Sequence, residues 1–287
     1  MPQYTDSSTG LTWNYTESGG NATIGTGGNY SDPGNATTLG TSLSGAITIP
    51  STVDGYTVTG IGQYAFSYCT SLETIDLSGT QVTTIGLSAF QSCSNLTSID
   101  LGNSVTTIGS SAFQQTGLTS VDLGNSVETI GSQAFLLCSS LISIDLPNSV
   151  TTIGTLAFRS CSSLTSITIP DSVTTIGSQA FNYCTGLTSI DLGNSVTTIG
   201  QYAFGYCSKI TSITIPDSVT SIGSYAFGAP WGPIGSPSTV YVKNVDPNDA
   251  YTMTTLQTTI SGKITGTVAY TQWVDPNAPH TVTLSDI

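Results

Sequence analysis

Apolar residues recur along most of the chain in units of about 23 residues. In the unit that begins at Leu187, the apolar positions are Leu187, Ile190, Leu192, Val196, Ile199, Phe204 and Cys207. A single unit cannot bury its apolar side alone, so the repeat predicts a solenoid in which neighbouring units stack on a shared core. The clearest column is the second residue of a repeated Ala-Phe pair, which includes every Phe of the chain: Phe66, Phe90, Phe113, Phe135, Phe158, Phe181, Phe204 and Phe227.

Each unit is expected to contain two extended pieces and one short helical turn. Ile190 and Leu192 are two positions apart, which is the strand period, whereas Phe204 and Cys207 suit one face of a helical turn. The Gly after each repeat Ile, such as Gly200, stands where the chain must turn, and we expect it at positive φ. The predicted fold is an α/β repeat solenoid, a right-handed superhelix rich in strands, with short helical turns on the outer side. We expect the first strands to pair as a parallel sheet.

The two ends of the chain depart from the repeat, as the caps of a solenoid do. Residues 1–46 are rich in Gly, Asn, Ser and Thr and are predicted to form an N-terminal cap. Residues 47–229 carry the repeats. After Phe227 the sequence Ala-Pro-Trp-Gly-Pro breaks the pattern, so residues 230–287 are assigned to a C-terminal cap and tail.

The charge of the chain excludes two classes of partner. Only 7% of the residues are charged, with four Lys and Arg against 17 Asp and Glu, so the net charge is −13. Such a surface repels nucleic acid and anionic membranes. No long apolar run is present, and the N-terminus lacks a basic segment followed by an apolar one. We therefore expect neither membrane insertion nor a signal peptide within these residues.

One column of aspartates lies between two inward apolar positions of the first strand and must point outward. If the units stack in register, Asp100, Asp122 and Asp145 bring like charges side by side, which favours a basic partner or a bound cation. Ca²⁺ is the natural candidate, because it takes several oxygen ligands; a solvated acidic strip is the alternative. The candidate partner-binding residues are these aspartates and a second outward column of serines: Asp76, Asp100, Asp122, Asp145, Asp191, Ser98, Ser120, Ser143, Ser166 and Ser189.

The remaining reactive side chains do not indicate an enzyme. Nucleophilic catalysis needs a base beside the nucleophile, and the single His, His280, lies in the tail. No cofactor other than calcium is expected. The Cys residues each follow a repeat Phe by three positions, with Thr116 in the same place in a shortened unit, and no Cys-x-x-Cys occurs. We expect a buried ladder of free thiols, since stacked helical turns lie too far apart for disulfides: Cys69, Cys93, Cys138, Cys161, Cys184 and Cys207.

The second extended piece carries paired threonines, for example Thr106 and Thr107, or Thr151 and Thr152. Regular threonine arrays on solenoids of low charge resemble ice-binding surfaces. Here Val and Ile are three positions apart rather than two, so the segment is expected to bend. Ice binding is the third functional hypothesis.

The unit Leu-x-x-Ile-x-(Leu/Ile)-Pro-x-Ser-Val-x-x-Ile-Gly-x-x-Ala-Phe-x-x-Cys resembles the BspA-like class of leucine-rich repeats, and residues 164–184 match it closely. The resemblance covers residues 47–242. It implies an extracellular or cell-surface, adhesin-like binding module that engages a protein or glycan of a cell or matrix along an extended repeat face. The alternative is a rigid structural spacer in a larger surface protein. Gly102, Gly124 and Gly193 stand where the family often has Pro, and Lys and Arg are few, so the partner stays open.

Overall fold

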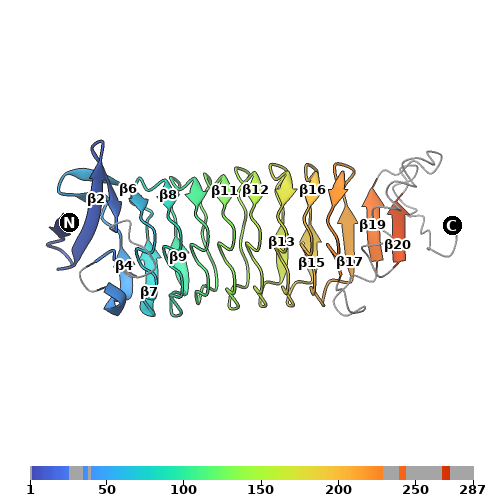
Figure 1. The fold of residues 1–287 in the computed structure, drawn as a ribbon, viewed down its shortest axis with the longest axis horizontal. Helices are drawn as coiled ribbons and strands as arrows, with labels where there is room; N and C mark the ends of the chain where they lie inside the picture. Colours follow the sequence, from blue (N-terminus) through green and yellow to red (C-terminus); the bar gives the residue numbers. More distant parts are fainter. Residues whose placement is uncertain (1, 26–34, 38–39, 229–238, 244–266, 272–287) are drawn as a thin grey trace.

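A computed structural model describes residues 2–25, 35–37, 40–228, 239–243 and 267–271 of the chain. The chain forms a β-solenoid whose turns, called rungs below, stand side by side in a nearly straight row (Figure 1). We number the rungs 1 to 8 by the Phe with which each unit closes, from Phe66 to Phe227. The predicted solenoid of leucine-rich repeat type is confirmed.

The second strands of the rungs form one continuous sheet. Pairing between rungs is parallel and in register, so that Thr107 pairs with Thr129 and Thr129 with Thr152. The N-terminal strands extend this sheet: β1 (Gln3–Thr5) and β3 (Asn21–Ile24) pair antiparallel with β2 (Thr12–Ser18), and β3 pairs parallel with β6. The rung strands of the sheet are β6 (Tyr56–Ile61, with β5, Thr52–Val53, on its edge), β8 (Thr84–Ile85), β10 (Thr107–Ile108), β11 (Thr129–Ile130), β12 (Thr152–Ile153), β14 (Thr175–Ile176), β16 (Thr198–Ile199) and β18 (Ser221–Ile222).

The first strands form three shorter parallel sheets instead of the single sheet expected from the sequence. One contains β4 (Ser44–Thr48), β7 (Ser71–Asp76) and β9 (Ser98–Asp100), another β13 (Ser166–Thr168) and β15 (Ser189–Asp191), and the third β17 (Ser212–Ile215), β19 (Thr239–Lys243) and β20 (Thr267–Thr271). In rungs 4 and 5 this segment is not a strand, and Asp122 makes an isolated bridge to Asp100. The layer of first strands is therefore interrupted near the middle of the solenoid.

The predicted helical turns are wrong. Within the described ranges the one helical element is the short 3₁₀ turn η1 (Gly40–Ser42), which precedes β4. The Phe segments are chains of tight turns, because the residue two before each Phe, and the residue two after each Phe from Phe66 to Phe204, have φ between 52° and 62°. Alternate N–H groups of these turns bond to the next rung, as from Phe66 to the Ala89 carbonyl at 2.7 Å. An α-helix would direct those N–H groups along its own axis, so bonding between rungs excludes it.

The glycine that follows each repeat Ile was expected at positive φ, and this is also wrong. The need for glycine comes from close approach instead. A Cβ on Gly154 would lie 2.7 Å from the carbonyl carbon of Gly131, and one on Gly177 would lie 2.6 Å from that of Gly154. Real Cβ contacts are longer, so only glycine lets the rungs stack this closely here.

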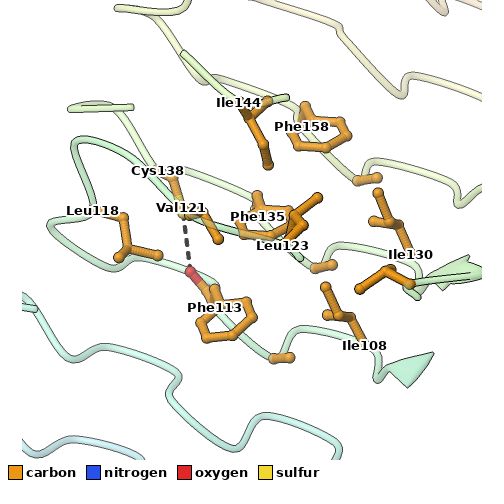
Figure 2. Packing of buried hydrophobic residues seen from close by; sticks show 14 of the residues in the cluster. Ile108, Phe113, Leu118, Val121, Leu123, Ile130, Phe135, Cys138, Ile144 and Phe158 are labelled. Carbon is orange, nitrogen blue, oxygen red and sulfur yellow. Dashed lines mark hydrogen bonds between the residues drawn. The ribbon is translucent and has the colours of Figure 1, made fainter. Parts of the chain in front are cut away.

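The core consists of ladders of identical side chains, one from each rung. Successive Phe rings stack nearly parallel with centroids 5.0–5.7 Å apart from Phe66 to Phe227. Figure 2 shows Phe113, Phe135 and Phe158 with the Ile108 and Ile130 side chains of the second strands beside them. Because each rung buries side chains at the same positions, the solenoid keeps nearly the same cross-section along its length.

Candidate functional site

The candidate binding residues lie on one side of the solenoid, which we call the acidic face: the Asp and Ser columns of the first strands named above. All ten side chains are at least partly exposed. In-register pairing places Asp76 beside Asp100, and Asp100 beside Asp122. In rungs 6 and 7, Ser166 lies beside Ser189. The acidic face is thus a regular, outward polar array, as the alternation of the sequence predicts.

Most of these aspartates also stabilise the turn that follows them. The carboxylates of Asp100 and Asp122 accept hydrogen bonds from the N–H two residues later, at 2.8 and 2.9 Å, and Asp191 does so at 3.2 Å. Asp76 accepts bonds from both the hydroxyl and the N–H of Ser78, which lower the pKa of its carboxyl. Each of these four carboxylates therefore uses one oxygen to hold the turn of its own rung.

Asp145 is the exception in this column. The residue two positions later is Pro147, which has no N–H to donate. In rungs 6 and 8, where Pro stands at this place, the column holds Thr168 and Thr214 rather than Asp. A carboxylate two residues before Pro cannot accept this turn bond. The turn therefore explains Asp76, Asp100, Asp122 and Asp191, but it does not explain Asp145.

This difference gives a matched pair of variants. Asp122→Ala removes the bond to the Gly124 N–H and is expected to lower the free energy of unfolding by about 1 kcal/mol. Asp145→Ala removes no turn bond and is expected to change it by less than about 0.5 kcal/mol. Urea unfolding followed by circular dichroism measures both. Equal losses in the two variants would show that the turn bond is not what Asp122 contributes.

A hollow of about 610 Å³ lies on the acidic face where the first strands are interrupted. Its walls come from rungs 3, 4 and 5 and include Asn103, Ser120, Asp122, Asp145 and Pro147. Rung 4 is the shortest unit of the repeat: Phe135 comes 22 residues after Phe113. The sequence contains that deletion, but the hollow that accompanies it was not predicted.

The structure gives the calcium hypothesis little geometric support. In the part of the chain that is described, no three His, Cys, Asp or Glu side chains come together in a way that could hold a metal ion. Each of these rungs contributes a single Asp to the column, and the next Asp belongs to the neighbouring rung, as in the pairs Asp76–Asp100 and Asp100–Asp122. Calcium at Asp100, Asp122 and Asp145 stays a prediction for a binding experiment to settle.

The six cysteines are free and buried, as predicted. The reason given for the absence of disulfides is wrong, since the turns that carry them are not helices and bond directly from rung to rung. Each thiol from Cys93 onward donates to the carbonyl of the Phe one rung before, for example Cys138 to Phe113 at 2.9 Å (Figure 2). Thr116, in the shortened unit, donates to Phe113 at 2.9 Å. The column thus requires a small side chain with a donor.

Burial raises the pKa of these thiols: to about 11 for Cys138, to about 12 for Cys69 and Cys207, and well above the ordinary value for Cys93, Cys161 and Cys184. A thiol with a raised pKa is a poor nucleophile and a poor metal ligand. The cysteines are therefore part of the core. His280 lies outside the described residues, so its lack of a catalytic role stays a prediction.

The paired threonines lie on a different side, over the continuous sheet. The hydroxyl of Thr106 donates to the Thr83 carbonyl at 3.2 Å, and that of Thr197 to the Thr174 carbonyl at 3.1 Å. Strand pairing includes only the second Thr of each pair, so the first Thr lies just before the strand. Ice binding remains untested by this geometry.

Comparisons with known proteins agree on the repeat. Within the described residues, no helix is long and apolar enough to cross a membrane. The comparison with curated proteins found no match. A leucine-rich repeat protein from Bacteroides ovatus is similar, with 25% identity, a TM-score of 0.54, and coverage of 81% of this chain and 69% of the other. The T. pallidum leucine rich repeat protein has 26% identity, a TM-score of 0.59, and coverage of 78% and 87%.

The family profile "BspA type Leucine rich repeat region (6 copies)" matches residues 40–142 and again residues 128–230, which together are well over half of the sequence. The matched residues contain the Phe, Cys and Gly columns that build the rungs. The chain belongs to the BspA-type leucine-rich repeat family.

Proposed function

We propose that this chain is an adhesin-like binding module that works outside the cell or at its surface, and that its acidic face is the surface that engages the partner. The observation that carries the proposal is the regular outward array of Asp and Ser in register along the rungs. Repeat proteins of this family generally mediate protein interactions, which supports a binding role rather than a catalytic one.

A repetitive face suits a partner that is itself extended or multivalent. Several rungs offer similar weak contacts, and contacts that are linked in one rigid rod add through effective concentration. With a net charge of −13, the chain attracts basic partners over long range and repels acidic ones. A basic protein surface therefore fits the acidic face better than an acidic glycan does.

The test is binding of the purified chain to arrays of matrix proteins and of glycans, each with Ca²⁺ and with a chelator. We expect saturable binding to a protein, weakened at least about tenfold in the variant with Asp100, Asp122 and Asp145 all changed to Asn. Binding that disappears only with chelator would establish the calcium hypothesis.

Two alternatives have their own outcomes in this design. An array without any saturable ligand would reject the binding module and favour the rigid spacer. An ice-recrystallisation assay on the same sample tests the threonine columns, since unchanged growth of ice grains would eliminate ice binding.

A further inference from the structure

Departures from the repeat pattern gather at rungs 4 and 5. Leu137 stands in a column that holds Ser92 in rung 2 and Ser160 in rung 5, and Ile142 stands in a column that holds Thr119 and Thr165 in the adjacent rungs. Leu137 is 42% exposed and Ile142 is 53% exposed, the highest values among the large apolar side chains of the described residues. Both flank the same turn, and each stands where the other described rungs carry a polar group: Tyr, Ser or Gln in the column of Leu137, and Thr or Glu in the column of Ile142.

The hollow on the acidic face includes residues of the same two rungs, together with Asn103 of rung 3. Ile142 precedes Asp145 by three residues along the first-strand segment of rung 5, and Asp145 lines the hollow together with Asp122 of rung 4. Pro147 denies Asp145 the turn bond that Asp100, Asp122 and Asp191 make. The hollow thus combines two carboxylates with room for a side chain, and the exposed Leu137 and Ile142 precede Asp145 by eight and three residues along the chain.

We propose that rungs 4 and 5 form a docking site for a protein segment that carries one basic and one large apolar side chain. The basic side chain enters the hollow between Asp122 and Asp145, while the apolar side chain packs on Leu137 and Ile142. This inference rests on the proposed function and narrows it to a place and to a partner of stated chemistry.

Charge complementarity selects a protein segment over a glycan. A neutral sugar leaves the charges of Asp122 and Asp145 without a counter-charge, whereas a Lys or Arg side chain supplies one in a partly enclosed site. The chain has only four Lys and Arg of its own, so a basic partner meets little repulsion.

The repeat itself provides variants that keep the fold. Ile142→Thr restores the residue found at the same place in rungs 4 and 6, and Leu137→Ser the residue of rung 5. Leu137 and Ser160 have φ of 62° and 61°, so serine fits this backbone. Asp145→Asn removes the charge without changing the shape. The matched control is Glu128→Gln, which removes an exposed carboxylate of rung 4 next to β11, outside the acidic face.

The experiment pans a phage-displayed library of random dodecapeptides against the immobilised full chain and measures the Kd of enriched peptides by fluorescence anisotropy. We expect enriched peptides to carry Lys or Arg together with Leu, Ile, Phe or Trp. Their Kd should rise at least about tenfold with Ile142→Thr and with Asp145→Asn, and less than about twofold with Glu128→Gln.

Other outcomes separate this inference from the proposed function. Peptides weakened by Asp191→Asn, which changes the same column in rung 7, but not by Asp145→Asn or Ile142→Thr would overturn the docking site and leave the acidic face as the binding surface. Failure to enrich basic, apolar peptides would also overturn the docking site, whereas the proposed function depends separately on the arrays.

Discussion

Gly154→Ala is expected to lower the free energy of unfolding by about 3 kcal/mol, although it adds a single methyl group. The new Cβ would lie 2.7 Å from the carbonyl carbon of Gly131 and 2.7 Å from the nitrogen of Ser132. Both atoms belong to backbone that is itself stacked on the rungs before it, so neither can move without opening the ladder. The loss is therefore expected to be larger than that of an ordinary surface substitution.

Urea or thermal unfolding measures this loss, with Gly79→Ala as the matched control. A Cβ on Gly79 would have no atom within 4 Å, and Gly79 does not have a positive φ. The control should be neutral or slightly stabilising, by up to about 0.5 kcal/mol. If Gly154→Ala behaved like Gly79→Ala, close approach would not be the reason for the glycine column.

The second large effect is loss of stability at alkaline pH. Burial raises the pKa of the six thiols in the folded chain, so their contribution to stability is complete below the unfolded thiol pKa, at about 8.5, and is lost as the pH rises through the folded values. Each buried thiol lowers the free energy of unfolding by about 1.4 kcal/mol per pH unit in that window. Six thiols together give a slope on the order of 8 kcal/mol per pH unit.

Urea unfolding at several pH values between about 8.5 and about 11 gives this slope. The control is a variant with Cys138, Cys161 and Cys184 changed to Ala, which removes half of the thiols. Its stability at neutral pH will be lower because of the cavities, but its slope should be about half that of the wild type. An unchanged slope would mean that other groups, such as the tyrosines, cause the alkaline loss.

The columns of the core could be predicted from the sequence because each has one environment repeated in every rung. An apolar residue at a fixed spacing has to be buried when units stack, which is why the Phe and Cys ladders were expected and found. The outward direction of Asp100 and Asp122 follows from the same alternation.

The backbone of the turns could not be predicted in the same way. The spacing of Ala203, Phe204 and Cys207 fits a helical face equally well, and what decides against a helix is hydrogen bonding to the next rung, such as Tyr202 to Ser224 at 3.0 Å. That bond depends on the distance between rungs, and the sequence of a single unit does not specify this distance. The same distance explains why positive φ was wrongly expected for the glycines. Their role is to avoid a clash with the backbone of the neighbouring rung, which local sequence does not reveal.

The candidate docking site was missed for a related reason. Leu137 and Ile142 read as ordinary apolar residues until the rungs are aligned and the exposure of their columns is known. Pro147 is visible in the sequence, but its effect on Asp145 appears only when the turn bond of the other aspartates is seen. Departures from a column are informative once the columns have a structural meaning.

The central claim is that the acidic face binds the partner. The most direct test compares two variants, each with three substitutions to Asn, on two different sides of the solenoid. One changes Asp100, Asp122 and Asp145 to Asn, and the other changes Thr107, Thr152 and Thr198 of the continuous sheet to Asn. The measurement is the Kd of each for the protein selected on the array. We predict at least about a tenfold rise for the aspartate variant and no change for the threonine variant. Equal affinities for wild type and aspartate variant, or a loss confined to the threonine variant, would contradict the account.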